Sequence, residues 1–259
     1  LGITIKLDYN HLGPTVYENL TLTKDAASKD LTYFCANGYP LTIGENVTTV
    51  AKANGYNFCL TGGTKDTAYE GGSHLTVRSG AWRNVYVGNY KGAMTGAAVY
   101  EMSGGTIDNY IGVTYNGTHT GPLTMTFTGG TVNGTVYGGN TYTSGAINGD
   151  VSISVSAPAA VNGDLAAGGR TGANGSVQLA LSNCAVRGSV STECSGVAAV
   201  DLEAAAGQTL SIGGGSLPVR SFQGGGTLSL SADTTLKVQS VTGSTLLSFQ
   251  DTPYNMVYI

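Results

Sequence analysis

The sequence predicts an all-β fold, a single-stranded parallel β-helix in which short strands stack coil upon coil to form a solenoid. Three observations predict it. Glycine makes up 40 of the 259 residues, similar segments recur at a nearly fixed interval, and stretches of alternating apolar and polar residues lie between them. Glycine at about twice its usual frequency, without a collagen period, is typical of repeat architectures. No stretch shows a convincing helical period, so we expect strands and turns throughout.

The repeat is marked by apolar anchor residues, each of which follows a turn of small residues. Ser-Gly-Gly-Thr-Ile at 103–107 and Thr-Gly-Gly-Thr-Val at 128–132 are two copies. The anchors are Trp82, Ile107, Val132, Val161 and Val186. Their spacing is nearly constant apart from one longer step, between Val132 and Val161, and it predicts coils of about 25 residues. An antiparallel β-sandwich is the competing fold, but it does not explain why similar side chains recur at one-coil offsets.

Strands are predicted at 123–128, 151–156 and 177–182, where apolar and polar side chains alternate with a period of two. The first of these places leucine, methionine and phenylalanine on one face and three threonines on the other. Because one coil cannot bury its apolar face alone, we expect these faces to stack into a continuous core. The Ser and Thr side chains then form a solvated outer face.

The period shortens toward the C-terminus. The segments 209–212, 227–230 and 245–248 recur at a constant step of about 18 residues, which predicts a coil with a smaller cross-section. We therefore expect one β-helix domain over 1–259. It would comprise an irregular N-terminal coil or cap at 1–30, main coils at 31–208 and narrower coils at 209–259.

The string Gly-Gly-Thr-Val-Asn-Gly-Thr-Val-Tyr-Gly-Gly at 129–139 carries a resemblance to known repeat proteins. The repeat pattern resembles the right-handed, pectin-lyase-like β-helices. More narrowly, the string is similar to the repeat of adhesin-like cell-surface proteins of gut anaerobic bacteria. This resemblance implies a right-handed coil and an extracellular or cell-wall-attached location. It also implies a non-catalytic structural or adhesin-like module that displays a rigid rod for contact with a ligand or host surface.

Composition excludes several partners. Charged residues are 11% of the chain and the net charge is −4, which argues against nucleic acid because phosphate binding needs a basic surface. No apolar run approaches the length of about 18 residues that a membrane span requires. The chain begins at Leu1 rather than Met, and we expect it to be a processed or trimmed piece of a longer protein. We expect a monomer that needs no cofactor.

Three tyrosines are the candidate ligand-binding residues. Tyr90, Tyr115 and Tyr142 follow their anchors at similar distances along the chain, in glycine-rich turns. Stacked on one side of the rod, they would form an exposed aromatic ladder able to pack against sugars and to donate hydrogen bonds. The ligand would be a polysaccharide, a host or bacterial surface glycan, or a protein. The alternative is structural: the tyrosines brace long turns against one another. Tyr86, Tyr110 and Tyr137 lie nearer the strands and should be partly buried.

The alternative function is a carbohydrate-active lyase or hydrolase, or the carbohydrate-binding domain of such an enzyme, because enzymes of this fold gather several carboxylates in a groove. The residues to suspect would be Asp150, Asp164 and Arg170. Asp201 and Glu203 point the same way on one strand, but the acids are otherwise scattered. His11, His74 and His119 fall in unrelated coils without other ligands at metal-binding spacing, so we expect no metal site.

A further column is predicted on the polar side of the anchors. Arg83, Asp108, Asn133, Asn162 and Arg187 each follow an anchor and should stack, with hydrogen bonds between the asparagines.

The cysteines form two pairs. Cys35 and Cys59 are separated by nearly one coil and should occupy the same place in adjacent coils, whereas Cys184 and Cys194 could close one coil. Two disulfides and four buried thiols remain as alternatives.

Overall fold

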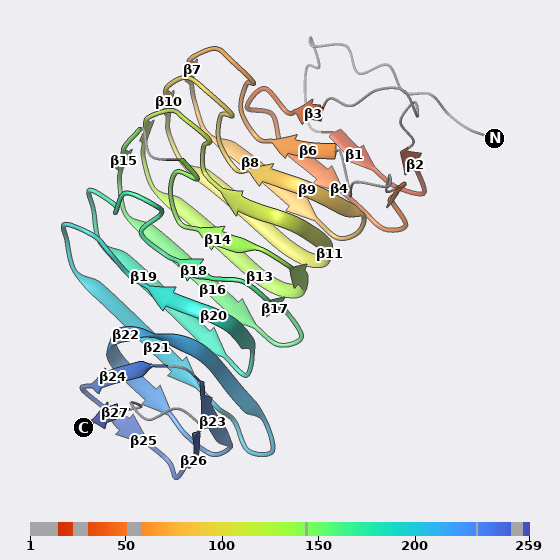
Figure 1. Cartoon of the computed structure of the whole chain (residues 1–259). Helices are drawn as coiled ribbons and strands as arrows, with labels where there is room; N and C mark the ends of the chain where they lie inside the picture. Colours follow the sequence, from red (N-terminus) through yellow and green to blue (C-terminus); the bar gives the residue numbers. More distant parts are fainter. Residues whose placement is uncertain (1–14, 23–30, 51–57, 143–144, 232, 250–255) are drawn as a thin grey trace.

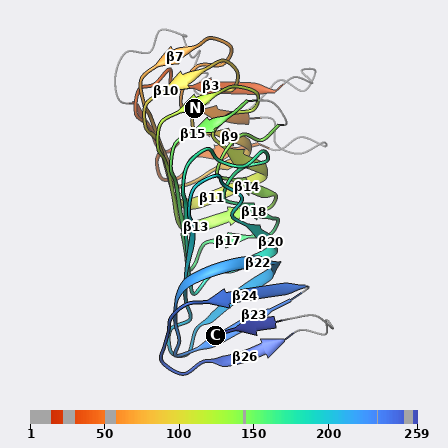
Figure 2. The ribbon, with the colours of Figure 1, turned by 90° about the vertical axis from the view of Figure 1, so that its left-hand side faces the viewer.

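The computed structural model describes residues 15–22, 31–50, 58–142, 145–231, 233–249 and 256–259. These residues form strands and turns without a helix. Every strand pairing among them is parallel, and the strands stack as a β-solenoid of about nine coils. Figures 1 and 2 show the coils stacked along one axis, with the N-terminal and C-terminal coils at opposite ends. The parallel pairing confirms the solenoid and excludes the β-sandwich.

Each wide coil has four sides, which we call faces A, B, C and D in chain order. Face A is built from β1 (Thr15–Tyr17), β4 (Leu41–Ile43), β8 (Ser73–Val77), the first parts of β11 (Ala98–Gly112) and β13 (Leu123–Val132), β16 (Val151–Ser156), β19 (Val177–Ser182), β21 (Ala198–Glu203), the end of β22 (Thr209–Gln223) and β25 (Val241–Thr242). Face B is built from the start of β9 (Ala81–Tyr86), parts of β11, β13 and β22, β17 (Ala160–Val161), the start of β20 (Ala185–Ser191), β23 (Thr227–Leu230) and β26 (Leu246–Phe249).

Face C is built from β3 (Thr32–Cys35), β6 (Phe58–Thr61), the ends of β9, β11 and β20, β14 (Thr135–Tyr137), β18 (Leu165–Ala166), the middle of β22, β24 (Thr234–Val238) and β27 (Met256–Tyr258). Face D is narrow and contains β7 (Tyr69–Glu70), β10 (Met94–Thr95), β12 (His119–Thr120) and β15 (Ile147–Asn148). It lies along one long edge of the solenoid in Figure 1. Near the N-terminus, β2 (Thr21–Leu22) pairs with β5 (Thr48–Thr49).

The anchors form one column of the core, as predicted. The register pairs Trp82 with Ile107, Ile107 with Val132, Val132 with Val161, and Val161 with Val186. All five side chains are buried. On face A, the inward residues Phe127, Val155 and Leu181 stack in the same way, and all three are buried. The period-two pattern therefore assigned these faces correctly.

The turns before four of the five anchors contain a residue in the left-handed region of backbone space, whereas the turn before Val161 contains the cis peptide bond Ala157–Pro158. Gly105 has a φ of 81° and Gly130 a φ of 80°, which glycine adopts without steric cost. In a later coil Asn183 takes this conformation, with a φ of 54°, and asparagine tolerates it better than most residues. The small residues of the repeat thus make the corner between faces A and B.

The coils narrow toward the C-terminus, as predicted, because face D is lost. The long strand β22 passes from face B through face C directly to face A, and β23, β24 and β25 repeat this three-sided path. One detail of the prediction is wrong. Thr227 pairs with Leu246 rather than with Thr245, so the last step is longer than expected. Leu247 then stacks on the buried Leu228.

Candidate functional site

The corner between faces C and D carries the predicted tyrosine ladder. Tyr90, Tyr115 and Tyr142 lie in the turns that follow β9, β11 and β14. The rings of Tyr90 and Tyr115 are stacked with centroids 5.1 Å apart, and those of Tyr115 and Tyr142 are stacked at 5.0 Å. A fourth ring, that of Tyr33 on β3, extends the ladder and lies 4.8 Å from Tyr90. We call these four residues the tyrosine ladder.

A second row of tyrosines supports the ladder from the outer side of face C. Tyr86 makes an edge contact with Tyr90, with ring centroids 5.0 Å apart, and its hydroxyl is 2.8 Å from that of Tyr110. Tyr110 in turn contacts Tyr137, with centroids 6.4 Å apart. As predicted, this row is buried or half-buried. Burial raises the pKa of Tyr86 and of Tyr110 above the ordinary phenol value, so both remain neutral.

Buried polar residues hold the turns that carry the ladder. Asn89 is fully buried, and its amide donates to the carbonyls of Thr67 and Ala93 at 3.0 and 2.9 Å. Its Oδ1 accepts the backbone N–H of Thr64 at 2.8 Å. Two coils later, the buried Asn140 donates to the Gly145 carbonyl at 3.0 Å. These bonds replace water inside the turns and fix the backbone on which the rings stand.

Sequence reasoning missed both Tyr33 and these braces. The sequence does contain a pattern that indicates these buried polar residues. Asn89 precedes Tyr90, Thr114 precedes Tyr115, and Asn140 lies shortly before Tyr142. Thr114 pairs with Asn140 across the coils and donates its hydroxyl to the Tyr90 carbonyl at 3.3 Å. The signal for Tyr33 was weak, because it comes from a strand of face C rather than from a turn.

The stacking decides which parts of the ladder can meet a ligand. Tyr90 and Tyr115 cover each other's ring faces, with planes inclined by 22°, and Tyr115 and Tyr142 do the same at 23°. The inner rings therefore present edges and hydroxyls outward, and the expected packing of sugars on their faces is closed to them. Tyr142 ends the ladder and is 45% exposed, so it is the ring most open to a ligand.

Three cations border the ladder. The ammonium of Lys91 lies 5.2 Å from the ring centroid of Tyr90, and that of Lys65 lies 5.3 Å from the centroid of Tyr33. At the other end, Arg170 extends a guanidinium nitrogen to within 3.5 Å of the Thr141 carbonyl. These arrangements favour cation–π attraction at the first two sites.

The carboxylates suspected of catalysis are not brought together. Asp150 precedes β16 and accepts the backbone N–H of Ser176 at 2.8 Å. Asp164 lies between β17 and β18 and accepts the backbone N–H of Ser189, also at 2.8 Å. The two acids occupy different corners, and each ties its own coil to the next. Arg170 lies at a third corner, beside the tyrosine ladder.

The other acidic pair is also engaged in contacts between coils. Asp201 binds Arg220 through two hydrogen bonds, one of them 3.0 Å long, and accepts a bond from the Ser221 hydroxyl at 2.6 Å. The bond from Arg220 holds the pKa of Asp201 below its ordinary value. Glu203 accepts the Ser182 hydroxyl at 2.6 Å. Both carboxylates therefore serve as ties between neighbouring coils.

The polar column behind the anchors forms in part. Asn162 donates to Asn133 at 2.9 Å, and Arg187 donates to Asn162 at 2.6 Å. Arg83 and Asp108 follow the paired anchors Trp82 and Ile107, at the point where the register between β9 and β11 shifts. Of the histidines, His74 lies 3.4 Å from Glu101, His119 is buried in β12, and His11 lies outside the described residues.

The prediction that Cys35 and Cys59 occupy the same place is wrong. Cys59 pairs with Tyr33, and Cys35 pairs with Thr61, because this coil is longer than the spacing between the two cysteines. All four cysteines are thiols in the structure. Burial raises the pKa of Cys35 to about 11 and that of Cys184 to about 12, so both thiols stay protonated at neutral pH.

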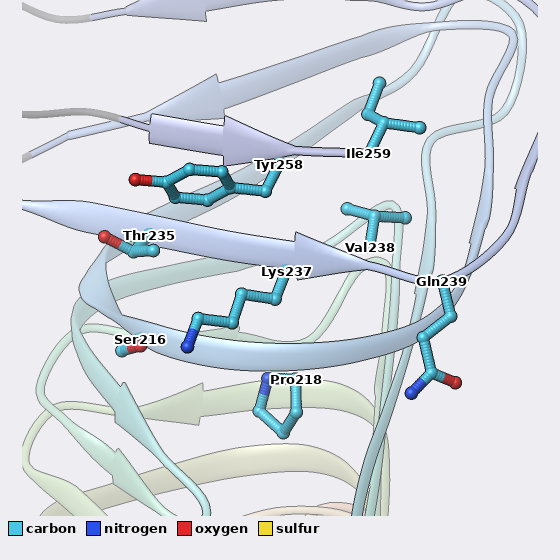
Figure 3. Close-up of a pocket in the computed structure, with 8 residues that line it drawn as sticks. All are labelled: Ser216, Pro218, Thr235, Lys237, Val238, Gln239, Tyr258 and Ile259. Atoms are coloured by element: carbon cyan, nitrogen blue, oxygen red, sulfur yellow. The ribbon is translucent and has the colours of Figure 1, made fainter.

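A second surface lies on the narrow coils. Figure 3 shows an open groove on face C, to which β22, β24 and β27 contribute Pro218, Lys237 and Tyr258 on successive strands. Its volume is about 670 Å³, and Ile259, the last residue of the chain, forms part of its wall. No buried polar side chain is among its lining residues. The tyrosine ladder is therefore the better-built site.

In comparisons with known proteins, the chain matches no protein family, no curated protein and no solved structure. Fold and site define its class as a parallel β-solenoid with an aromatic ladder on one corner. Within the described residues, no helix is long and apolar enough to cross a membrane.

Proposed function

We propose that this chain is a non-catalytic, adhesin-like module of a secreted or cell-surface protein, and that it binds glycans through the tyrosine ladder. The observation that carries the proposal is the row of stacked rings on one corner, held by buried asparagines. A solenoid resists bending because each coil pairs with its neighbours along several strands, so the ladder is presented as a rigid surface. The resemblance of the repeat to bacterial adhesin-like proteins supports the surface location.

The structural alternative, that the tyrosines only brace the turns, accounts for the inner rings but leaves the exposed end unexplained. Tyr142 leaves 45% of its surface in solvent. Tyrosine combines an apolar ring with a hydroxyl, and it loses few rotatable bonds on binding. An enzymatic role receives no support from Asp150 and Asp164, because their separate corners cannot hold one substrate bond between them.

The test is retention of the purified protein on a panel of plant, mucin and bacterial polysaccharides, with and without Ca²⁺. New reducing or unsaturated ends are scored in the same samples. We expect retention without new ends, and we expect Tyr142→Ala to weaken it. Tyr258→Ala is the matched control, because Tyr258 is 53% exposed and lies on the narrow coils. New ends would refute the non-catalytic assignment, and equal retention of the two variants would refute the site.

A further inference from the structure

The tyrosine ladder and the second row of tyrosines form one connected network of rings. Tyr86 in the second row contacts Tyr33, Tyr90 and Tyr115, with ring centroids 6.4, 5.0 and 6.5 Å away. It also contacts Tyr110, whose centroid lies 5.9 Å away. With the stacking inside the ladder, these contacts join the two rows into a path of phenol rings that runs along the corner without a break.

Tyr142 is the member of this network that is most open to solvent. It is 45% exposed, whereas the other members are buried or half-buried. Among the described residues, its ring contacts that of Tyr115, at 5.0 Å, and no other. Tyr142 is therefore both the end of the path and the point at which another large molecule can reach it.

A connected path of phenols can carry an oxidation from one ring to another. Tyrosine is among the side chains that lose one electron most easily, and the oxidised phenol then loses its proton and becomes a neutral radical. Electrons exchange rapidly between aromatic rings in contact. The fully buried Tyr86 has no water to take its proton, and its hydroxyl is bonded to that of Tyr110. Exposed Tyr142 can release its proton to water, which favours the radical there.

From these observations we propose that Tyr142 is a cross-linking site, at which a haem peroxidase and hydrogen peroxide join this chain to a second copy through dityrosine. The other rings of the network collect the oxidation and pass it to Tyr142. Each Tyr142 gives up one electron and its phenol proton, and the two radicals form a carbon–carbon bond between ring positions next to the oxygens. The hydrogens on those carbons then move to the oxygens, and one hydrogen peroxide takes up the two electrons and two protons to give two waters.

This function goes beyond glycan binding and needs no glycan. The test treats the whole protein with a haem peroxidase and limiting hydrogen peroxide. Denaturing electrophoresis and dityrosine fluorescence measure covalent dimers, and mass spectrometry of peptides identifies the linked tyrosines. We expect dimers linked from Tyr142 to Tyr142, and we expect their loss in Tyr142→Phe. Tyr39 is 36% exposed but lies outside the network, so it should be linked far less often.

Two variants separate delivery through the network from simple exposure. Tyr115→Phe keeps a ring beside Tyr142 but removes the phenol that contacts it, so linkage at Tyr142 should fall to the level of Tyr39. Tyr137→Phe is the matched control. It removes a phenol that contacts Tyr110 and leaves the ladder continuous, so the yield of dimers should not change. Unfolding in urea should abolish the preference for Tyr142 over Tyr39, which tests the network without a substitution.

Equal linkage at Tyr142 in the wild type and in Tyr115→Phe would show that exposure alone selects the site, and it would refute delivery through the network. Linkage through Tyr39 as often as through Tyr142 in the folded protein would refute the site. Oxidation that accumulates at Cys59, the register partner of Tyr33, instead of at Tyr142 would also overturn the proposal. Because no glycan is present, none of these results bears on glycan retention, and the two proposals can fail separately.

Discussion

The hydroxyls of Tyr86 and Tyr110 lie 2.8 Å apart and share a hydrogen bond beneath the tyrosine ladder. Tyr86 is 1% exposed, so its hydroxyl has been removed from water by folding. A buried hydroxyl without a partner is costly, and this bond therefore joins two of the four coils that carry the ladder, those of Tyr90 and Tyr115.

Tyr110→Phe should lower the free energy of unfolding by about 1–3 kcal/mol, because it removes the partner of a buried hydroxyl. The double variant Tyr86→Phe with Tyr110→Phe should be more stable than the sum of the two single changes implies. Thermal denaturation of the four proteins measures this cycle. Strictly additive effects would show that the two hydroxyls do not interact.

Charge on the inner side of face A should unfold the central coils. Phe127 and Ile153 are 2% and 1% exposed, and burying an unpaired carboxylate at either site should cost about 5 kcal/mol or more. Ser152→Asp is the control, since Ser152 is adjacent to Ile153 on β16 but points outward. Circular dichroism should show loss of structure for Phe127→Asp and for Ile153→Asp. The control variant Ser152→Asp should keep its structure. Wild-type melting of Phe127→Asp would reverse the assignment of inner and outer faces.

Close stacking of turns makes some glycines irreplaceable for steric reasons. A Cβ on Gly134 would lie 1.6 Å from the carbonyl oxygen of Asn109 in the preceding coil. Gly134→Ala should therefore destabilise the protein by about 3 kcal/mol. In Gly207→Ala the new methyl has no atom within 4 Å, and the only cost is the left-handed backbone, about 1 kcal/mol. Equal melting temperatures for the two variants would contradict the register between these turns.

Stability should fall as the pH drops below about 6.5, the ordinary pKa of histidine. Burial lowers the pKa of His119 in the folded protein, so below that pH the unfolded chain binds a proton that the folded chain does not. The free energy of unfolding continues to fall until the pH is below the pKa of His119 in the folded protein. Denaturant titrations across this range measure it. His119→Leu should abolish this step, whereas replacing the half-exposed His74 by glutamine should retain it. A step that persists in His119→Leu would assign it to another group.

Thiol titration decides between the disulfide and thiol alternatives for the cysteines. We expect four reactive thiols after unfolding without reductant, because Cys35 and Cys59 are out of register along their strands. Before unfolding, Cys184 should react slowly, because it is buried and its pKa is raised to about 12. Only two thiols after unfolding would show that one disulfide forms.

The parts of the fold that could be predicted are those fixed by periodicity. Alternation identified the inward side chains of β13, β16 and β19, and the anchors gave the register of face B. The errors arose where a coil departs from the common length. Cys35 and Cys59 suggested a shorter step than the one that pairs β3 with β6, and a longer last turn shifted Thr245 out of register.

The candidate site was predicted only in outline. Spacing placed Tyr90, Tyr115 and Tyr142 on one corner, but it carried no information about ring orientation. The stacking that closes the ring faces depends on side-chain direction, and the contribution of Tyr33 depends on how β3 lies beside a turn. The grouping of Arg170 with Lys65 and Lys91 depends on the stacking of the coils, because Arg170 lies one coil beyond Tyr142.

The central claim, that ligands bind along the tyrosine ladder, is tested most directly by hydroxyl-radical footprinting with a polysaccharide that the protein retains. The account predicts that the ligand lowers labelling of Tyr142 and Tyr115 and leaves Tyr258 unchanged. Protection of Tyr258 with full labelling of Tyr142 would contradict it and would move the binding site to the narrow C-terminal coils.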